Sequence, residues 1–122
     1  MNKNIFWIFE TEVTGEIEKV KSLMNEMVDY TKANEPGALF YEWFISADNS
    51  RCTLFERFDS SESALLHAVS FGKNFAGRFM EILKPKKFTL FGNPKDDMKS
   101  AAEKMGAIFM IPLGGFNRQD NH

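Results

Sequence analysis

Apolar side chains along the chain follow two patterns, short dense runs and longer segments with a helical repeat. Residues 4–13, 39–46, 51–58 and 87–92 are runs rich in β-forming residues. Between these runs, apolar side chains return every three or four positions, as one face of a helix requires. The order predicts strand, helix, strand, strand, helix, strand, then one more helix and a short apolar segment.

The first predicted helix and the hairpin that follows it are delimited by local signals. Thr14 is the expected N-cap, and the apolar face continues to about Asn34. The stretch Glu35-Pro-Gly then ends the helix, and we interpret it as a helix terminus without a functional role. Asp48-Asn49-Ser50 has the composition of a tight turn and predicts a hairpin between the second and third strands.

The later helices also have recognisable ends. Asp59 and Glu62 have the spacing of a capping box, and Pro85 is expected to close the second helical region. Gly72 marks a point at which that region could kink or divide. Asn93-Pro94 is the expected start of the last helix, with asparagine as N-cap and proline as the first helical residue.

This order of elements is the ferredoxin-like plan, in which a βαββαβ unit forms a four-stranded antiparallel sheet with two helices on one face. We therefore predict an α+β fold with an extra C-terminal helix. The 122 residues fit a single domain, residues 1–122. Its core is expected to cover about residues 4–94, and residues 95–122 form a C-terminal extension.

The predicted strands are apolar on both faces, although a sheet covered on one face should alternate apolar and polar positions. In the second strand, Tyr41 and Trp43 lie on one side, and Phe40 and Phe44 lie on the other. Each large apolar side chain left in water forgoes roughly 1.5–3 kcal/mol. Because the chain is too short to cover this face itself, we predict a homodimer in which two sheets pack together.

Composition and charge narrow the classes of partner. The chain has a net charge of -2 with interspersed signs, so it lacks the basic stripe expected of a nucleic-acid-binding protein. No apolar run approaches the ~20 residues of a membrane span, and no signal-peptide pattern is present. Two histidines and one cysteine do not suffice for a conventional zinc site. These features predict a cytoplasmic protein without a nucleic-acid or membrane partner and without a metal.

Two glutamates on the predicted hairpin are candidates for proton transfer. A two-residue loop would pair Glu42 with Phe55 and Glu56 with Tyr41. A three-residue loop would instead place the two glutamates opposite each other, where each would raise the pKa of the other. The alternative role for either carboxylate is an ion pair with Arg51 or Arg57 at the edge of a dimer.

Aromatic residues on the hairpin are candidates for the wall of a binding pocket. Tyr41, Trp43 and Phe44 could line such a wall, although each also suits the core of the sheet or of a dimer. Arg51 or Arg57 could stabilise an anion beside them. Cys52 has no identifiable base nearby in the sequence and is expected to be a core thiol.

The stretch EPGALFYEWFISADNSRCTLFERFDSSESALLHAVSFGKNFAGRF resembles the antibiotic biosynthesis monooxygenase (ABM) domain of the dimeric α+β barrel superfamily. The similarity lies in the EPG helix exit, the paired YEWF and LFERF strands, and an acidic-Ser helix start followed by ALLH. It covers about residues 6–91. It implies a homodimeric α+β barrel and a quinol-monooxygenase-like activity, in which O2 is added to quinols or polycyclic phenols without metal or flavin.

The resemblance also directs attention to a helix histidine. His67 stands where ABM sequences often carry one, on a row with Phe71 and Asn74 that could rim a pocket. A neutral histidine there could accept a proton from a phenol. The alternative is a half-exposed histidine with a structural hydrogen bond.

Two hypotheses follow. The first is a cofactor-independent monooxygenase that binds a small phenolic or quinol substrate among the hairpin aromatic residues and uses Glu42, Glu56 or His67 as base. The second is a non-catalytic dimeric module that binds a small ligand or haem. In the haem version, His67 is the candidate axial ligand.

Overall fold

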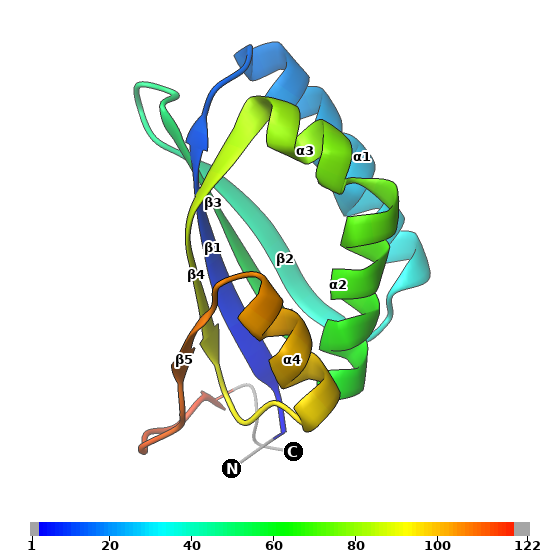
Figure 1. Cartoon of the computed structure of the whole chain (residues 1–122), viewed down its shortest axis with the longest axis vertical. Coiled ribbons are helices and arrows are strands. Elements are labelled where there is room, and N and C mark those ends of the chain that lie inside the picture. Colours follow the sequence, from blue (N-terminus) through cyan, green and yellow to red (C-terminus); the bar gives the residue numbers. More distant parts are fainter. Residues whose placement is uncertain (1–2, 119–122) are drawn as a thin grey trace.

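A single five-stranded sheet, covered on one face by helices, forms the core of the protein (Figure 1). The computed structural model describes residues 3–118. The strands lie in the order β2-β3-β1-β4-β5. In chain order the elements are β1 Ile5–Val13, α1 Ile17–Asn34, β2 Ala38–Ile45, β3 Arg51–Phe58, α2 Ser61–Asn74, α3 Ala76–Ile82, β4 Leu83–Phe91, α4 Asp96–Lys104 and β5 Ile108–Met110.

The first four strands in the chain and the helices between them confirm the predicted ferredoxin-like α+β fold. β1 lies between β3 and β4 and is antiparallel to both, while β2 pairs with the outer side of β3. The C-terminal segment adds β5, which runs parallel to β4, so the sheet is mixed rather than antiparallel throughout. Among the described residues, no helix is both long enough and apolar enough to cross a membrane.

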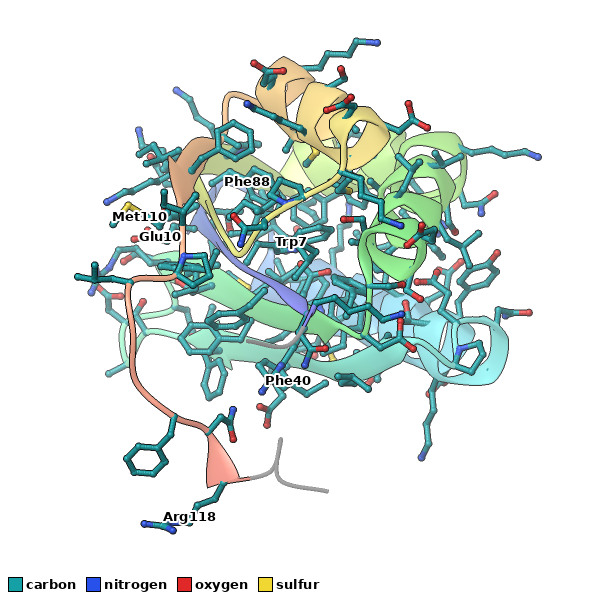
Figure 2. All side chains as sticks on the ribbon, turned by 90° about the horizontal axis from the view of Figure 1, so that it is seen from below. Trp7, Glu10, Phe40, Phe88, Met110 and Arg118 are labelled. Atoms are coloured by element: carbon teal, nitrogen blue, oxygen red, sulfur yellow. The ribbon has the colours of Figure 1, made fainter. Side chains whose placement is uncertain are left out.

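Alternation along the strands separates an inner face, toward the helices, from an outer face. In β1, Ile5, Trp7 and Phe9 are buried beneath the helices, while Phe6 and Ile8 point to the outer face and stay partly exposed. Trp7 and Phe88 lie in the interior, with their ring centres 5.3 Å apart (Figure 2). The outer face is also apolar, as the sequence predicts, because Phe6 contacts the rings of Phe40, Phe55 and Phe91 there.

Two predicted helix starts are wrong by one or two residues. The N-cap of α1 is Glu16, and Thr14 lies before the helix, where its N–H donates to Ile82 O at 2.9 Å. The N-cap of α2 is Ser60, whose hydroxyl accepts a hydrogen bond from Ser63 N at 3.2 Å. In both cases contacts around the N-terminus shift the start of the helix by one or two residues, and the segment is still helical as predicted.

The second helical region divides at Phe75 rather than at Gly72. Phe75 leaves the helical conformation and is buried, with its ring centre 5.5 Å from that of Tyr30 in α1. Packing of this ring, and not glycine flexibility, accounts for the break between α2 and α3. Pro85 does not close the helix either, because it lies within β4 beside an irregularity in the pairing with β1, where its missing N–H is tolerated.

The start of the last helix also differs from the prediction. The N-cap of α4 is Lys95 rather than Asn93, and the first helical residue is Asp96 rather than Pro94. The backbone N–H of Lys95 donates to Ser61 Oγ at 2.9 Å, and its amine donates to Glu62 at 2.7 Å. The start of α4 is therefore fixed by contacts with α2, which local sequence signals do not contain.

The turn between β2 and β3 determines which side chains share a face. Asp48 organises the turn by accepting hydrogen bonds from the hydroxyls of Ser46 and Ser50 at 2.8 and 2.6 Å. Donation from Ser50 first, and then from Ser46, lowers the pKa of Asp48 to about 2. The resulting register pairs Glu42 with Phe55, which is the pairing expected for a two-residue loop. Successive strand residues alternate between faces, so Glu42 and Glu56 lie on opposite sides of the sheet.

Candidate active site

A histidine held between two carboxylates lies buried between the sheet and α2. Three separate elements supply the cluster: Glu35 follows the end of α1, Glu56 lies in β3, and His67 lies in α2. The Nδ1 atom of His67 donates to Glu35 Oε1 at 2.7 Å, and its Nε2 atom lies 2.8 Å from Glu56 Oε1. The residues are 4%, 2% and 6% exposed, in the order Glu35, Glu56 and His67. We call this group the Glu–His–Glu cluster.

The two carboxylates determine the charge of the histidine. Burial by itself would lower the pKa of His67, but the charge of Glu56 and the hydrogen bonds with Glu35 and Glu56 raise it to about 10. The raised pKa favours an imidazolium near neutral pH, so the carboxylates beside His67 suit proton acceptance better than a neutral ring does. The acceptors of the cluster are the carboxylate oxygens of Glu35 and Glu56.

Aromatic rings enclose the cluster on the sheet side. The ring of His67 has its centre 5.3 Å from Tyr41, 5.2 Å from Phe58 and 6.0 Å from Trp7. A cavity of about 20 Å³ adjoins Glu56 and His67. Tyr41, Phe71, Phe88 and Met105 are among the side chains that line it. A volume of that size accommodates one water or dioxygen molecule.

Several buried polar atoms in this region lack a hydrogen-bond partner among the described residues. They are Glu35 Oε2, Tyr41 Oη and Trp43 Nε1, while Glu56 Oε1 is paired with His67 Nε2. Each such group costs roughly 1–3 kcal/mol when it stays unpaired, so native proteins rarely leave three close together. One is a carboxylate acceptor and two are donors. A ligand with a hydroxyl group could satisfy both kinds.

Tyr41 completes the polar side of the site as a neutral phenol. Burial first, and then the charge of Glu56, raises its pKa well above the ordinary value of 10.0. Tyr41 therefore donates a hydrogen bond rather than accepting a proton. Cys52 is buried nearby, and its burial raises the thiol pKa to about 11, so Cys52 is a core thiol rather than a nucleophile.

The structure brings several of the expected site residues together. Glu56, His67, Tyr41 and Phe71 line the same small cavity. Trp43 lies beside them, with its ring centre 6.3 Å from that of Tyr41. These side chains share the inner face because the register of β2 and β3 places Tyr41 opposite Glu56.

Four other expected residues lie away from this cluster. Glu42, Phe44 and Arg57 project from the outer face, since each is one strand position removed from an inner-face residue. Asn74 ends α2, is exposed, and donates from its amide to Ser70 Oγ at 3.2 Å. The row from His67 to Asn74 therefore does not rim one pocket, because His67 and Phe71 line the cavity and Asn74 does not.

Sequence reasoning missed Glu35. The interpretation of Glu35-Pro-Gly as a helix terminus without further role is wrong for its first residue, whose carboxylate is buried against His67. Pro36 keeps the preceding residue out of the helical conformation, and Glu35 has φ -129° and ψ 78°. The available signal was a carboxylate at a helix C-terminus, where negative charge is unfavourable and therefore calls for an explanation.

The cluster does not fit haem. Both ring nitrogens of His67 are engaged by carboxylates, so neither offers a lone pair to iron. A cavity of about 20 Å³ is also far too small for a macrocycle. His122, the other histidine, lies outside the described residues.

The fold and the site together define a ferredoxin-like α+β domain with a buried Glu–His–Glu cluster. No protein-family model matches the chain, and no curated protein matches it. Several solved structures are similar to the chain in fold. MupZ from Pseudomonas fluorescens superposes with a TM-score of 0.84 at 16% identity, over 98% of each chain. SnoaB, a cofactor-independent oxygenase from Streptomyces nogalater, gives 0.65 at 12% identity, over 76% of this chain and 95% of its own.

A third structure carries the family name. A protein from Nitrosomonas europaea, provisionally named an antibiotic biosynthesis monooxygenase, superposes with a TM-score of 0.64 at 19% identity, over 74% of this chain and 89% of its own. The chain thus has a fold similar to that of a protein named as an antibiotic biosynthesis monooxygenase. This confirms the resemblance drawn from the sequence at the level of the fold.

Proposed function

We propose that this protein is a cofactor-independent monooxygenase that oxidises a phenolic or quinol substrate with O2. The observation that carries the proposal is the Glu–His–Glu cluster, with unpaired buried oxygens beside an aromatic cavity. The similarity of fold to SnoaB supports the same reaction class. An electron-rich arene reduces O2 directly once it is deprotonated, so such an enzyme needs only a base, a dry pocket and a counter-charge.

Glu56 is the proposed base. Its carboxylate accepts the proton of the substrate hydroxyl, and the resulting phenolate transfers one electron to O2. The arene radical and superoxide then combine at a ring carbon and form a C–O bond, and the peroxide is protonated by Glu56. Cleavage of the O–O bond with loss of the ring hydrogen releases water and leaves a carbonyl. A hydroxyarene and O2 thereby give a quinone and water, and the substrate supplies every electron.

His67 and Glu35 have supporting roles in this scheme. When Glu56 takes the substrate proton, the imidazolium of His67 remains beside the new phenolate and offsets its charge. Glu35 holds Nδ1 of His67 and keeps the ring oriented. The cluster and substrate carry the same total charge before and after the transfer, so no net charge enters the buried site.

Substrate entry requires movement of side chains, because the cavity holds O2 but not an aromatic ring. Met105 and Phe71 are partly exposed members of its lining. Methionine adapts its shape easily, so displacement of Met105 gives a ring the simplest path toward Glu56. The direct test is oxygen uptake by the purified protein with a panel of naphthols and naphthohydroquinones. Enzyme-dependent uptake supports the proposal, and the absence of uptake with every member contradicts it.

We also propose that the protein is a homodimer joined through the outer face of the sheet. Phe44 on that face is 51% exposed, and Phe55 lies between it and Phe6. Light scattering should give about twice the 14.0 kDa chain mass. Phe55→Glu should give monomers, because it places a charge in the interface.

Leu66→Glu is the matched control for this dimer prediction. Leu66 is an apolar α2 residue that is 53% exposed on the opposite side of the protein, so its substitution should leave the mass unchanged. A wild-type protein that scatters as a single chain at micromolar concentration would refute the dimer. Equal dissociation by both variants would place the interface elsewhere.

A further inference from the structure

The segment after β5 leaves the sheet as an extended arm. Strand β5 ends at Met110, and residues 111–118, which we call the arm, follow it. Figure 2 shows the arm running out from Met110 to Arg118, clear of the helices. Leu113 and Phe116 on the arm are 102% and 80% exposed, more than any other large apolar side chain in the described part of the chain. Two such side chains close together on an exposed segment indicate a surface that another molecule covers.

The middle of the arm stands away from the rest of the chain. Gly114 and Gly115 lie between the two apolar side chains, and a Cβ atom at either glycine would meet nothing within 4 Å. Ile111 and Asn117, in contrast, line a pocket on the outer face of the sheet. Both ends of the arm therefore lie at the outer face, and the part between them is free to contact whatever packs on that face.

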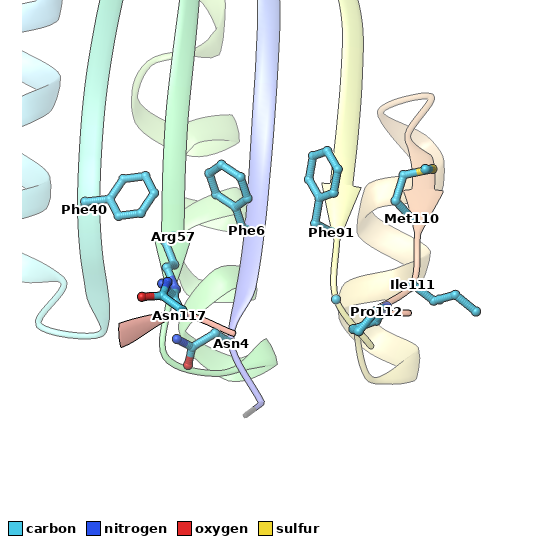
Figure 3. Close-up of a pocket in the computed structure, with 10 residues that line it drawn as sticks. Asn4, Phe6, Phe40, Arg57, Phe91, Met110, Ile111, Pro112 and Asn117 are labelled. Carbon is cyan, nitrogen blue, oxygen red and sulfur yellow. The ribbon is translucent and has the colours of Figure 1, made fainter. Parts of the chain in front are cut away.

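The pocket beside the arm has a volume of about 480 Å³ and an aromatic floor. Phe40, Phe6 and Phe91 lie in a row across β2, β1 and β4 (Figure 3). The ring of Phe6 is stacked with that of Phe91, with ring centres 5.4 Å apart, and meets the ring of Phe40 edge-on at 5.5 Å. A further aromatic side chain fits this row through the same face and edge contacts.

In the homodimer proposed above, this outer pocket lies within the interface and requires an occupant. Interfaces pack as densely as protein interiors, and a void left between apolar side chains is destabilising in proportion to its volume. Two sheets that met without filling the pockets would enclose a void of about 480 Å³ in each subunit. The arm is long enough to fill the pocket of the other subunit, because residues 111–118 span up to roughly 28 Å when extended and packed sheets lie about 10 Å apart.

We propose that the arm clasps a second copy of this chain, with Phe116 of the partner subunit seated among the three phenylalanine rings of the outer pocket. Two-fold symmetry makes the exchange reciprocal, so each arm fills the pocket of the other subunit. The exchange accounts for both the exposed arm and the unfilled apolar pocket. It rests on the proposed homodimer and is independent of the proposed oxygenase chemistry, because the pocket shares no side chain with the inner cavity.

The first measurement is the dissociation constant of the dimer, from sedimentation velocity over a dilution series. Phe116→Ser should raise this constant at least about 100-fold, because symmetry removes a buried aromatic anchor at two places and each anchor contributes about tenfold or more. Leu66→Ser is the matched control. Leu66 lies in α2 on the opposite side of the protein and is 53% exposed, so the constant should stay within about twofold of the wild-type value.

The second measurement locates the arm, by isotope-filtered NOE spectra of dimers formed from one labelled and one unlabelled chain. Contacts should run from the ring of Phe116 in one chain to the three pocket phenylalanines in the other. Contacts confined to one chain would show that the arm folds over its own pocket, and would overturn the exchange.

Two further outcomes separate the exchange from the dimer itself. A dimer with the same dissociation constant in Phe116→Ser and Leu66→Ser would overturn the exchange and leave the homodimer standing. A wild-type protein that stays a single chain at micromolar concentration would overturn both. Neither measurement uses substrate or oxygen, so no outcome depends on whether the protein is an oxygenase.

Discussion

Replacing Glu56 with glutamine should abolish oxygen uptake and leave a folded protein. Glutamine has nearly the same shape, but it cannot accept the substrate proton. General-base catalysis contributes about 100- to 10,000-fold, so kcat on an active hydroxyarene should fall by at least about 100-fold. KM should change little, because the ring contacts of the substrate remain. Steady-state oxygen consumption with wild-type and variant protein measures both parameters.

The fold should survive because the substitution removes one of two buried negative charges. Glu35 and His67 remain as a pair at 2.7 Å, and the cluster becomes neutral. Near-ultraviolet circular dichroism and the urea midpoint should therefore match or exceed the wild-type values. A variant that is folded and still turns over at the wild-type rate would exclude Glu56 as the base.

Glu42→Gln is the matched control for this experiment. It makes the same chemical change on the neighbouring strand, but Glu42 lies opposite Phe55 on the outer face. Its kcat should stay within about twofold of the wild-type value. Equal losses in both variants would contradict the assignment of the base to the inner face, and would point to a general effect on the hairpin.

Replacing His67 with leucine should have the largest effect on stability. Glu35 and Glu56 are 4% and 2% exposed, and the substitution leaves both carboxylates buried without a counter-charge. Breaking a buried ion pair by removing one partner costs about 3–5 kcal/mol. Urea unfolding near neutral pH should show that loss. Adding Glu35→Gln and Glu56→Gln to His67→Leu removes both buried charges, so this triple variant should recover part of the lost stability.

The stability of the wild-type protein should also depend on pH through His67. Its pKa is raised from the ordinary 6.5 to about 10 in the folded protein, so folding favours the protonated ring. The resulting stabilisation is complete below about pH 6.5 and is lost as the pH rises through about 10. The free energy of unfolding should fall across this window by at most about 1.4 kcal/mol per pH unit.

Urea unfolding at stepped pH, with His67→Leu as comparison, separates this effect from other titrations. The difference in stability between wild type and variant should shrink as the pH rises toward 10. A constant difference across the window would show that His67 does not carry the charge assigned to it.

The order and type of the elements could be predicted because they depend on local patterns. Dense runs of β-forming residues predicted the strands, and apolar positions spaced three or four apart predicted the helices. Pro36-Gly37 predicted a helix end, and α1 does end just before it, at Asn34. Helix starts were less predictable. Thr14 and Asn93 have good capping side chains, but contacts from Ile82 and Ser61 shift the helix starts to later residues.

The candidate site was only partly predictable, because both faces of the hairpin are apolar. Periodicity could not say whether Glu42 or Glu56 faces the helices, and the turn residues were compatible with two registers. The hydrogen bonds of Asp48 in the turn select one register, and with it the inner position of Glu56. Glu35 could not be paired with His67 from the sequence, since the two are 32 positions apart and meet only after α1 and α2 pack on the sheet.

The most direct test of the central claim is turnover of a naphthohydroquinone under isotopically labelled dioxygen, followed by mass spectrometry of the product. The proposed reaction puts one labelled oxygen atom into each quinone formed and the other into water. Wild-type protein should give singly labelled product, and Glu56→Gln should give no more than the protein-free solution. Product without label, or the same labelled yield from Glu56→Gln as from wild type, would contradict an oxygenase that works through the buried Glu–His–Glu cluster.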